Sequence, residues 1–211
     1  MRALSFVPLA LAALAACSTA SGTAASAAPS AAVADSQVVI LVRHAEKAVI
    51  AGESDPPLSP AGEQRALVLA NLLRRWELGP ESRAYDPDAI LRIRGIDRIF
   101  VTQYRRTQAT AAPLAQLLRI VPDTFSTRAP DHPAAVAAAA RAHRGKAVVV
   151  VGHSNSIPAI ITALGAGPMA ELCEAEYSHL FIVVLRDGAA PRLERRTYGE
   201  PDPPGASNCP R

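Results

Sequence analysis

Basic side chains stand at the ends of three short apolar segments of this sequence. Arg43 and His44 follow the first segment, Arg105 and Arg106 come soon after the second, and His153 follows the third. A guanidinium can donate two parallel hydrogen bonds to phosphate oxygens, and an imidazole can attack phosphorus. Phosphoryl transfer needs mainly positioning and neutralisation of charge, which a cationic cradle can supply. These residues therefore predict phosphoryl transfer without a metal ion or cofactor, provided that the fold brings them together.

The segments that must position these residues alternate between apolar runs and stretches of helical periodicity. This alternation predicts an α/β fold of three layers, a mostly parallel sheet between two layers of helices. Continuous β-branched and aliphatic runs are typical of strands buried on both faces. In such sheets ligands bind beyond the carboxyl ends of the strands, so the basic residues should meet at one edge. We expect strands at 38–42, 96–101, 147–151, 180–185 and 193–198, and helices from Ser59-Pro60, at 107–118 and at 133–143.

At these positions the sequence resembles the histidine phosphatase superfamily, which includes phosphoglycerate mutases and phosphohistidine phosphatases. The resemblance runs from about Val38 to Leu185 and rests on four segments, Val42-Arg43-His44-Ala45-Glu46, Asp55-Pro56-Pro57-Leu58-Ser59-Pro60-Ala61-Gly62, Thr102-Gln103-Tyr104-Arg105-Arg106-Thr107-Gln108-Ala109-Thr110 and Val151-Gly152-His153-Ser154. It implies a compact phosphoglycerate mutase-like domain, similar to the phosphohistidine phosphatases.

The resemblance also implies a mechanism and a role for each matching residue. The enzyme would hydrolyse a phosphomonoester or phosphoramidate through a phosphohistidine intermediate on His44. Arg43, Arg106 and His153 would form the phosphate cradle, with Ser154 beside them. Arg106 is preferred to Arg105 because the arginine of the family lies four residues after a Ser or Thr, here Thr102.

The chain departs from the family pattern in three places. Ala45 replaces the usual glycine, and we expect its methyl group to be tolerated. Lys47 stands where a small polar residue is common, and segment 119–145 contains no glutamate, although the general acid of the family is usually a glutamate there. We therefore expect Asp131, at a predicted helix start facing the pocket, to be the general acid. The alternatives are Asp123, Glu46 and Asp55.

The other histidines and one serine motif allow competing interpretations. His132, His143 and His179 have the pattern of structural or surface residues, and their spacing matches no compact zinc motif. The sequence Gly-His-Ser-Asn-Ser approaches the nucleophile elbow of esterases, so a serine esterase using Ser154 is an alternative. Its last glycine is missing, and His179 precedes Asp187, which breaks the usual order of the triad. A further alternative is a lipoprotein that binds a phosphorylated ligand without turning it over.

The first residues predict export and anchoring. Residues 1–16 have a short positive start and an apolar core that is too short to span a bilayer, as in a signal peptide. Cys17 follows as in bacterial lipoproteins, so we expect it to carry lipid and to anchor the protein in the bacterial cell envelope, facing the periplasm. Residues 17–36 are a low-complexity tether, and residues 37–211 form one phosphatase domain. Cys173 and Cys209 can form a disulfide that pins the Pro-rich tail.

The net charge of the chain and the length of segment 119–145 limit the kinds of partner that the protein can bind. The formal net charge is only +3, and no basic run interleaved with aromatic residues is present, so a nucleic-acid partner is disfavoured. The short segment 119–145 leaves little room for a large cap over the site. An open pocket of this kind suits a phosphorylated small molecule or a phosphoprotein.

Overall fold

A six-stranded mixed sheet lies at the centre of the computed structural model, which describes residues 36–77 and 95–209. The strand order is β3-β2-β4-β1-β5-β6; the first four strands are parallel, and β5 and β6 are antiparallel to their neighbours. The predicted α/β class with a mostly parallel sheet is confirmed. The strands are β1 Gln37–Arg43, β2 Ile96–Thr102, β3 Asp123–Phe125, β4 Ala147–Gly152, β5 His179–Leu185 and β6 Arg192–Thr197.

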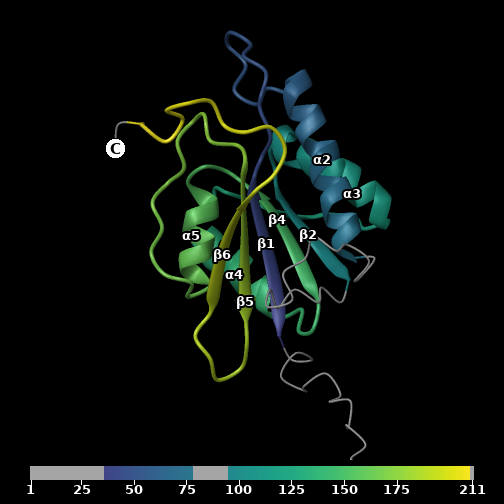
Figure 1. The fold of residues 1–211 in the computed structure, drawn as a ribbon, viewed down its shortest axis with the longest axis vertical. Helices are drawn as coiled ribbons and strands as arrows, with labels where there is room; N and C mark the ends of the chain where they lie inside the picture. The colour runs from purple at the N-terminus through teal and green to yellow at the C-terminus, as the bar shows by residue number, and fades with distance from the viewer. Residues whose placement is uncertain (1–35, 78–94, 210–211) are drawn as a thin grey trace, which may run out of the picture.

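Two helices cover each face of this sheet (Figure 1). Helices α2 (Pro60–Glu77) and α3 (Arg105–Leu118) pack on one face, and α4 (His132–Arg141) and α5 (Ser156–Ala163) pack on the other. The helix predicted at 107–118 begins two residues earlier, and the helix predicted at 133–143 covers 132–141. Strand β3 was not predicted, because its three residues are mostly exposed and carry no buried apolar run.

Strand β1 is the middle of the core. Val38, Ile40 and Val42 pack toward α2 and α3, whereas Val39 and Leu41 pack toward α4 and α5. Burying each such side chain contributes about 1.5–3 kcal/mol relative to leaving it exposed, which explains why this continuous aliphatic run forms a central strand.

The pairing of β1 with β4 brings two distant segments to the same edge of the sheet. Arg43, the last residue of β1, pairs with Gly152, the last residue of β4. The backbone N–H of His44 donates to the Gly152 carbonyl over 2.9 Å. The residues that follow the two strands, His44 and His153, are therefore held next to each other.

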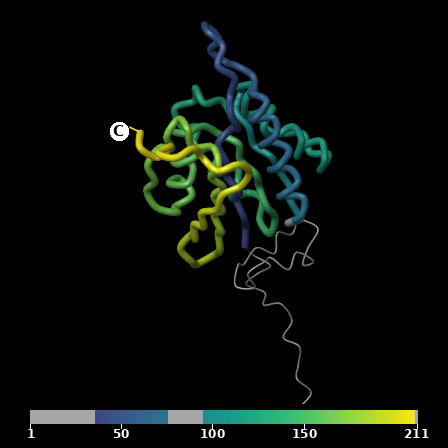
Figure 2. Tube along the Cα trace, turned by 45° about the horizontal axis from the view of Figure 1, so that its top comes forward, coloured from purple at the N-terminus to yellow at the C-terminus, as the bar shows by residue number. Residues whose placement is uncertain are grey.

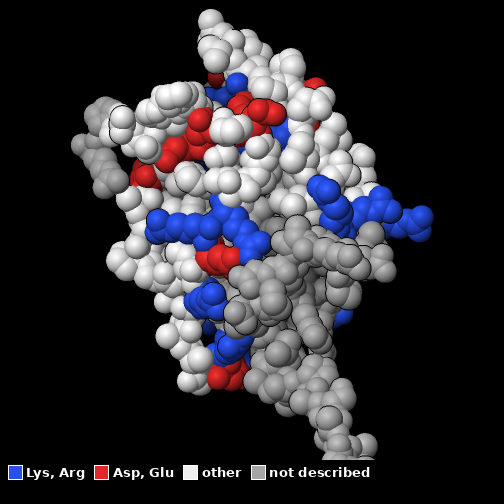
Figure 3. Space-filling view, viewed as in Figure 1, with Lys and Arg blue, Asp and Glu red and all other residues white. Residues whose placement is uncertain are grey.

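The two edges of the sheet are protected differently. Strand β3 is only three residues long, and β6 carries Arg192, Arg195 and Arg196. Figure 3 shows basic side chains gathered over the face on which β6 lies. Short strands and charged edges both discourage pairing with strands of other molecules.

The chain enters β1 at the end of the sheet remote from His44. Figures 1 and 2 show β1 running from this end toward the loop that joins it to α2. The proposed signal peptide, Cys17 and the tether as far as residue 35 lie outside the described residues. Within 36–77 and 95–209, no helix has both the length and the apolar character needed to cross a membrane.

Candidate active site

A cavity of about 730 Å³ opens at the carboxyl ends of β1 and β4 and at the start of α3. It is lined by five residues that the sequence singled out, Arg43, His44, Arg106, His153 and Ser154. Arg105 is exposed and is not among the lining residues. Residues far apart along the chain therefore converge on one hollow.

The side chain of His44 is fixed in one tautomer. Its Nδ1 lies 2.8 Å from the Ala45 carbonyl oxygen. Because a carbonyl oxygen only accepts hydrogen bonds, Nδ1 must donate, and Nε2 carries the lone pair when the ring is neutral. The structure thus leaves Nε2 of His44 as a potential nucleophile.

The loop after His44 is packed tightly against α2 and α3. The Ala45 methyl group is buried with Leu58 and Ala66, which agrees with the expectation that a methyl group fits here. The Ala45 N–H donates to Thr110 Oγ1 over 2.9 Å. A Cβ atom at Gly62 would lie only 2.2 Å from the Glu46 carbonyl oxygen, so only glycine lets the loop approach α2 this closely.

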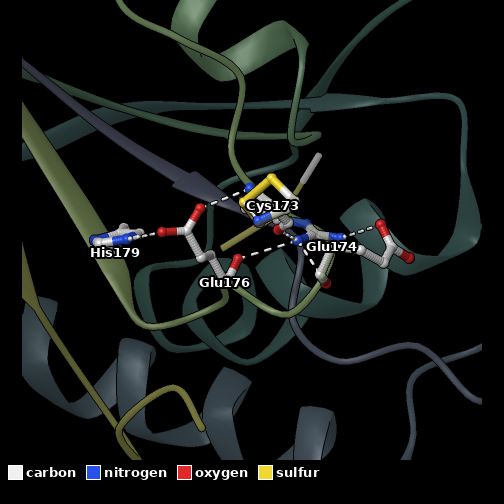
Figure 4. Close-up of a disulfide and its surroundings, with 6 residues drawn as sticks. Cys173, Glu174, Glu176 and His179 are labelled. Carbon is white, nitrogen blue, oxygen red and sulfur yellow. Dashed lines mark hydrogen bonds and ion pairs between the residues drawn. A yellow bond between two sulfur atoms is a disulfide. The ribbon is translucent and has the colours of Figure 1, made fainter. Parts of the chain in front are cut away.

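Arg43 is held by the segment Leu172–Ser178, which we call the disulfide loop. Figure 4 shows Cys173, Glu174 and Glu176 of this loop. Nη1 of Arg43 donates to the carbonyl oxygens of Cys173, Glu174 and Glu176 at 2.7, 2.9 and 3.1 Å. Nη2 donates to Glu174 Oε2 at 2.9 Å, and the guanidinium lies 4.1 Å from the centre of the Tyr177 ring. Nε is buried and has no hydrogen-bond partner in the described part of the chain.

The disulfide between Cys173 and Cys209 holds this loop against the C-terminal segment. It pairs the two cysteines that the sequence suggested. Asp202 strengthens the junction, because its carboxylate accepts hydrogen bonds from the N–H groups of Tyr177 and Ser178. The loop that supports Arg43 is thus crosslinked to the end of the chain.

Arg106 has fewer protein contacts than Arg43. Its Nη1 donates to Asp55 Oδ1 at 3.1 Å, and its guanidinium lies 4.3 Å from the centre of the Tyr104 ring. Asp55 also accepts the backbone N–H of Arg105, which fixes the first turn of α3. Nε of Arg106 is buried and has no hydrogen-bond partner among the described residues. Both arginines therefore present an unpaired, buried donor.

His153 lies beside His44 in an edge-on arrangement, with 5.3 Å between the ring centroids. Its Nε2 is 3.0 Å from Thr102 Oγ1, and Thr102 Oγ1 also contacts Thr107 Oγ1 at 2.9 Å. The threonine before the arginine pair thus anchors the second histidine. This contact gives the spacing between Thr102 and Arg106 a structural reason.

Burial and the two arginines keep both imidazoles neutral. Burial, together with the charges of Arg43, His153 and Arg106, lowers the pKa of His44 to about 3, although the Ala45 hydrogen bond opposes this. Burial, with the charges of Arg106, His132 and Arg43, lowers the pKa of His153 to about 4. At neutral pH, Nε2 of His44 is therefore unprotonated and free to attack.

None of the four carboxylates considered as general acid is among the lining residues. Asp131, which the sequence led us to expect at the pocket, is exposed and is not among the lining residues. The reason is its place just before α4, where the next side chain, that of His132, is the one that turns inward. Asp123 is on β3 near Arg98, Glu46 is bound by Arg65, and Asp55 is bound by Arg106.

Other residues, which the sequence did not mark as part of the site, also line the cavity. Glu171 and Glu174 are its carboxylates, and His132, interpreted from the sequence as a structural or surface residue, lies in its wall. Glu174 is bound by Lys47 and Arg43. No motif marks these residues; the one available signal was Cys173, whose pairing with Cys209 brings Glu174 to Arg43.

The esterase triad is not assembled. Ser154 lines the cavity, but His179 does not; its Nε2 contacts Glu176 at 3.2 Å. His143 lies near Asp97, also away from the lining. Within residues 36–77 and 95–209, no group of three or more His, Cys, Asp or Glu residues is placed to hold a metal ion.

Solved structures share this fold. The protein histidine phosphatase SixA in complex with tungstate aligns with a TM-score of 0.50 and 18% sequence identity, covering 76% of this chain and 96% of that one. A mycobacterial glucosyl-3-phosphoglycerate phosphatase aligns with a TM-score of 0.50 and 16% identity, covering 77% of this chain and 98% of that one. No protein-family model and no curated protein matches the sequence. The chain has the fold of these phosphatases, and the predicted phosphoglycerate mutase-like fold is confirmed.

Proposed function

We propose that this chain is a histidine phosphatase that transfers the phosphoryl group of its substrate to Nε2 of His44 and then to water. One observation carries the proposal. A neutral imidazole, with its lone pair on Nε2, lines the same cavity as two arginines, and each arginine has a buried Nε that no described residue pairs with. Buried donors without partners are costly, and a bound phosphate dianion would satisfy them.

The chemistry follows from this arrangement. Arg43, Arg106 and His153 bind the phosphoryl oxygens and neutralise the charge that spreads over them in the transition state. Nε2 of His44 attacks phosphorus, and the electron pair of the breaking bond leaves with the substrate group. Water then attacks the phosphohistidine and releases inorganic phosphate. The cationic residues perform the neutralisation that a metal ion performs in other phosphotransferases.

The proposal extends to location and substrate class. The disulfide between Cys173 and Cys209 supports an exported protein, because such bonds persist in oxidising compartments. We propose that Cys17 carries the lipid anchor and that the domain faces the periplasm. A cavity of about 730 Å³ accommodates a small phosphorylated molecule or the phosphorylated side chain of a protein.

The test is hydrolysis of an aryl phosphate by the purified protein in the presence of a chelator. We expect turnover in the wild type, inhibition by vanadate, and a loss of at least about a thousandfold in His44→Ala. His143→Ala removes a histidine outside the cavity and serves as the matched control. Retained activity in His44→Ala would refute the proposed nucleophile.

Two further measurements separate the alternatives. Quenching with alkaline detergent during turnover should trap a phosphoenzyme that is stable to base and labile to acid, as a phosphohistidine is. Tight phosphate binding without turnover would instead favour a non-catalytic binding lipoprotein. Ser154→Ala should retain phosphatase activity, whereas hydrolysis of carboxylic esters that depends on Ser154 would favour the esterase.

A further inference from the structure

A third histidine stands in the wall of the cavity. His132 is the first residue of α4, and only 5% of its surface is exposed. It lines the same cavity as His44 and His153, and its charge contributes to lowering the pKa of His153. His132 is therefore a member of the site, although its sequence context carries no motif.

The imidazole of His132 lies close enough to the Ser126 backbone for that backbone to raise its pKa, yet no described residue meets the ring in hydrogen-bonding geometry. Nδ1 and Nε2 are both buried, and neither has a partner in hydrogen-bonding geometry within the described residues. Leaving a buried polar group unpaired costs about 1–3 kcal/mol, so most such groups in folded proteins have a partner. Because this ring borders the cavity, the partner that fits it is a bound molecule.

The backbone holds this ring in a defined place. The His132 N–H donates to the Ala129 carbonyl over 3.1 Å, and the Ala135 N–H donates to the Asp131 carbonyl over 2.9 Å. Pro133 follows directly at the start of the helix, where its fixed φ is favourable. The side chain thus projects from a closed turn and the first residue of a helix.

The carboxylates near the site are poorly suited to donate a proton. Burial alone would raise the pKa of Glu174, but its hydrogen bond from Lys47 and the charge of Arg43 outweigh burial and hold the pKa below its ordinary value. Glu174 is therefore ionised at neutral pH. Asp131 is exposed and outside the lining, and Glu171 is an exposed residue of the lining. His132 is the buried candidate.

We propose that His132 is the proton donor to the leaving group, an inference that rests on the proposed phosphatase function. As His44 Nε2 bonds to phosphorus, the bond between phosphorus and the leaving oxygen breaks and its electron pair moves to that oxygen. The imidazolium of His132 gives this oxygen a proton and becomes neutral. In the second step neutral His132 takes a proton from the attacking water, which restores the imidazolium and releases phosphate.

The electrostatics of the bound state favour this role. In the free protein, burial lowers the pKa of His132 more than the Ser126 backbone and the Asp131 carboxylate raise it. A phosphoryl dianion in the cradle adds negative charge near the ring and so favours its protonated form. Substrate binding itself would thus prepare the donor.

The test compares two substrates that differ only in the leaving group. Phenolate is a poor leaving group and benefits from a proton, whereas 2,4-dinitrophenolate leaves without one. In full-length His132→Ala and His132→Gln, we expect kcat/KM for phenyl phosphate to fall by about a hundredfold or more, while kcat/KM for 2,4-dinitrophenyl phosphate stays within about threefold of the wild type. The second value also shows that the variants are folded and that their cradle is intact.

Other outcomes overturn the inference. Equal losses on both substrates would make His132 a structural or binding residue, and no loss on either would remove it from the reaction. A loss that depends on the leaving group in Glu171→Gln, but not in the His132 variants, would assign the proton to Glu171. Failure of the proposed function looks different, because then the wild type cleaves neither substrate or His44→Ala cleaves both.

Discussion

The strand-end cradle and the disulfide loop both shape the cavity, but they do so by different means. The strand-end cradle, by which we mean His44, His153 and Arg106 without Arg43, is positioned by parallel strands and the first turn of α3. The disulfide loop has no regular strand or helix, and it positions Arg43 through three carbonyl oxygens and one carboxylate. In the proposed reaction the strand-end cradle supplies the reacting groups, and the loop determines how one arginine is presented to them.

We expect lysine substitutions at Arg43 and at Arg106 to have different effects on stability. Arg43→Lys should lower kcat/KM by about a hundredfold or more and also lower the free energy of unfolding by about 2–4 kcal/mol, because a lysine cannot reach all the loop acceptors. Arg106→Lys should cause a similar loss of activity but change stability by less than about 1 kcal/mol, since Arg106 forms a single ion pair, with Asp55, in the part of the chain that the structure describes. Kinetics and urea unfolding on both variants measure these values. Equal stability losses would erase the distinction.

Removing the disulfide tests the loop alone. The Cys173→Ser/Cys209→Ser variant should lose about 2–4 kcal/mol of unfolding free energy, because a long loop of the unfolded chain is no longer closed. Its kcat/KM should fall about threefold to tenfold, because the Cys173 carbonyl that binds Arg43 becomes less fixed. Reductant should reproduce both effects in the wild type and have no further effect on the variant. Full activity in a destabilised variant would show that the loop does not position Arg43.

The two histidines of the strand-end cradle should make the free energy of unfolding depend on pH. The folded pKa values of His44 and His153 are about 3 and about 4, below the ordinary value of 6.5. At pH values between the folded and the unfolded pKa, the unfolded chain binds more protons than the folded protein. The contribution of each histidine to the free energy of unfolding is therefore fully present above about pH 6.5, and it falls with decreasing pH by up to about 1.4 kcal/mol per pH unit. Denaturation between pH 4.5 and 6.5 measures the slope. An unchanged slope in His44→Asn/His153→Asn would show that other groups cause it.

The smallest effect is expected at the rim. Lys47 contacts Glu174 Oε1 at 2.7 Å, but 37% of the lysine side chain and 67% of the glutamate side chain are exposed. Lys47→Ala should therefore change the free energy of unfolding by less than about 1 kcal/mol.

Glu46→Gln breaks the ion pair with buried Arg65 and should lower the free energy of unfolding by about 3 kcal/mol. Thermal or urea unfolding of the two variants compares them, and a larger loss in Lys47→Ala would contradict this order.

The strand-end cradle could be predicted from the sequence because paired strands fix the positions of the residues that directly follow them. Aliphatic runs buried on both faces mark β1 and β4, and their parallel pairing places His44 and His153 side by side. The expected convergence of residues at one sheet edge depends only on these local patterns. Short β3 had no such pattern and was not predicted.

The loop and the third histidine depend on contacts that no local pattern encodes. Glu174 reaches Arg43 because Cys173 pairs with Cys209, a long-range link whose geometry a sequence does not specify. At the start of α4 a single residue decides which side chain points inward: Asp131 is exposed, and His132 is buried. The sequence led us to expect Asp131 at the cavity, whereas of these two neighbours it is His132 that lines it.

The direction of β1 bears on which molecules can reach the pocket. Its first residue, Gln37, and its last, Arg43, are separated by about 20 Å of extended chain, and only the latter lies at the cavity. If Cys17 is lipidated as we propose, the tether joins the domain at the end opposite the opening of the cavity. The opening of the cavity then faces away from the bilayer, toward molecules dissolved in the surrounding compartment. Lipid headgroups of the membrane that holds the protein are therefore less accessible as substrates.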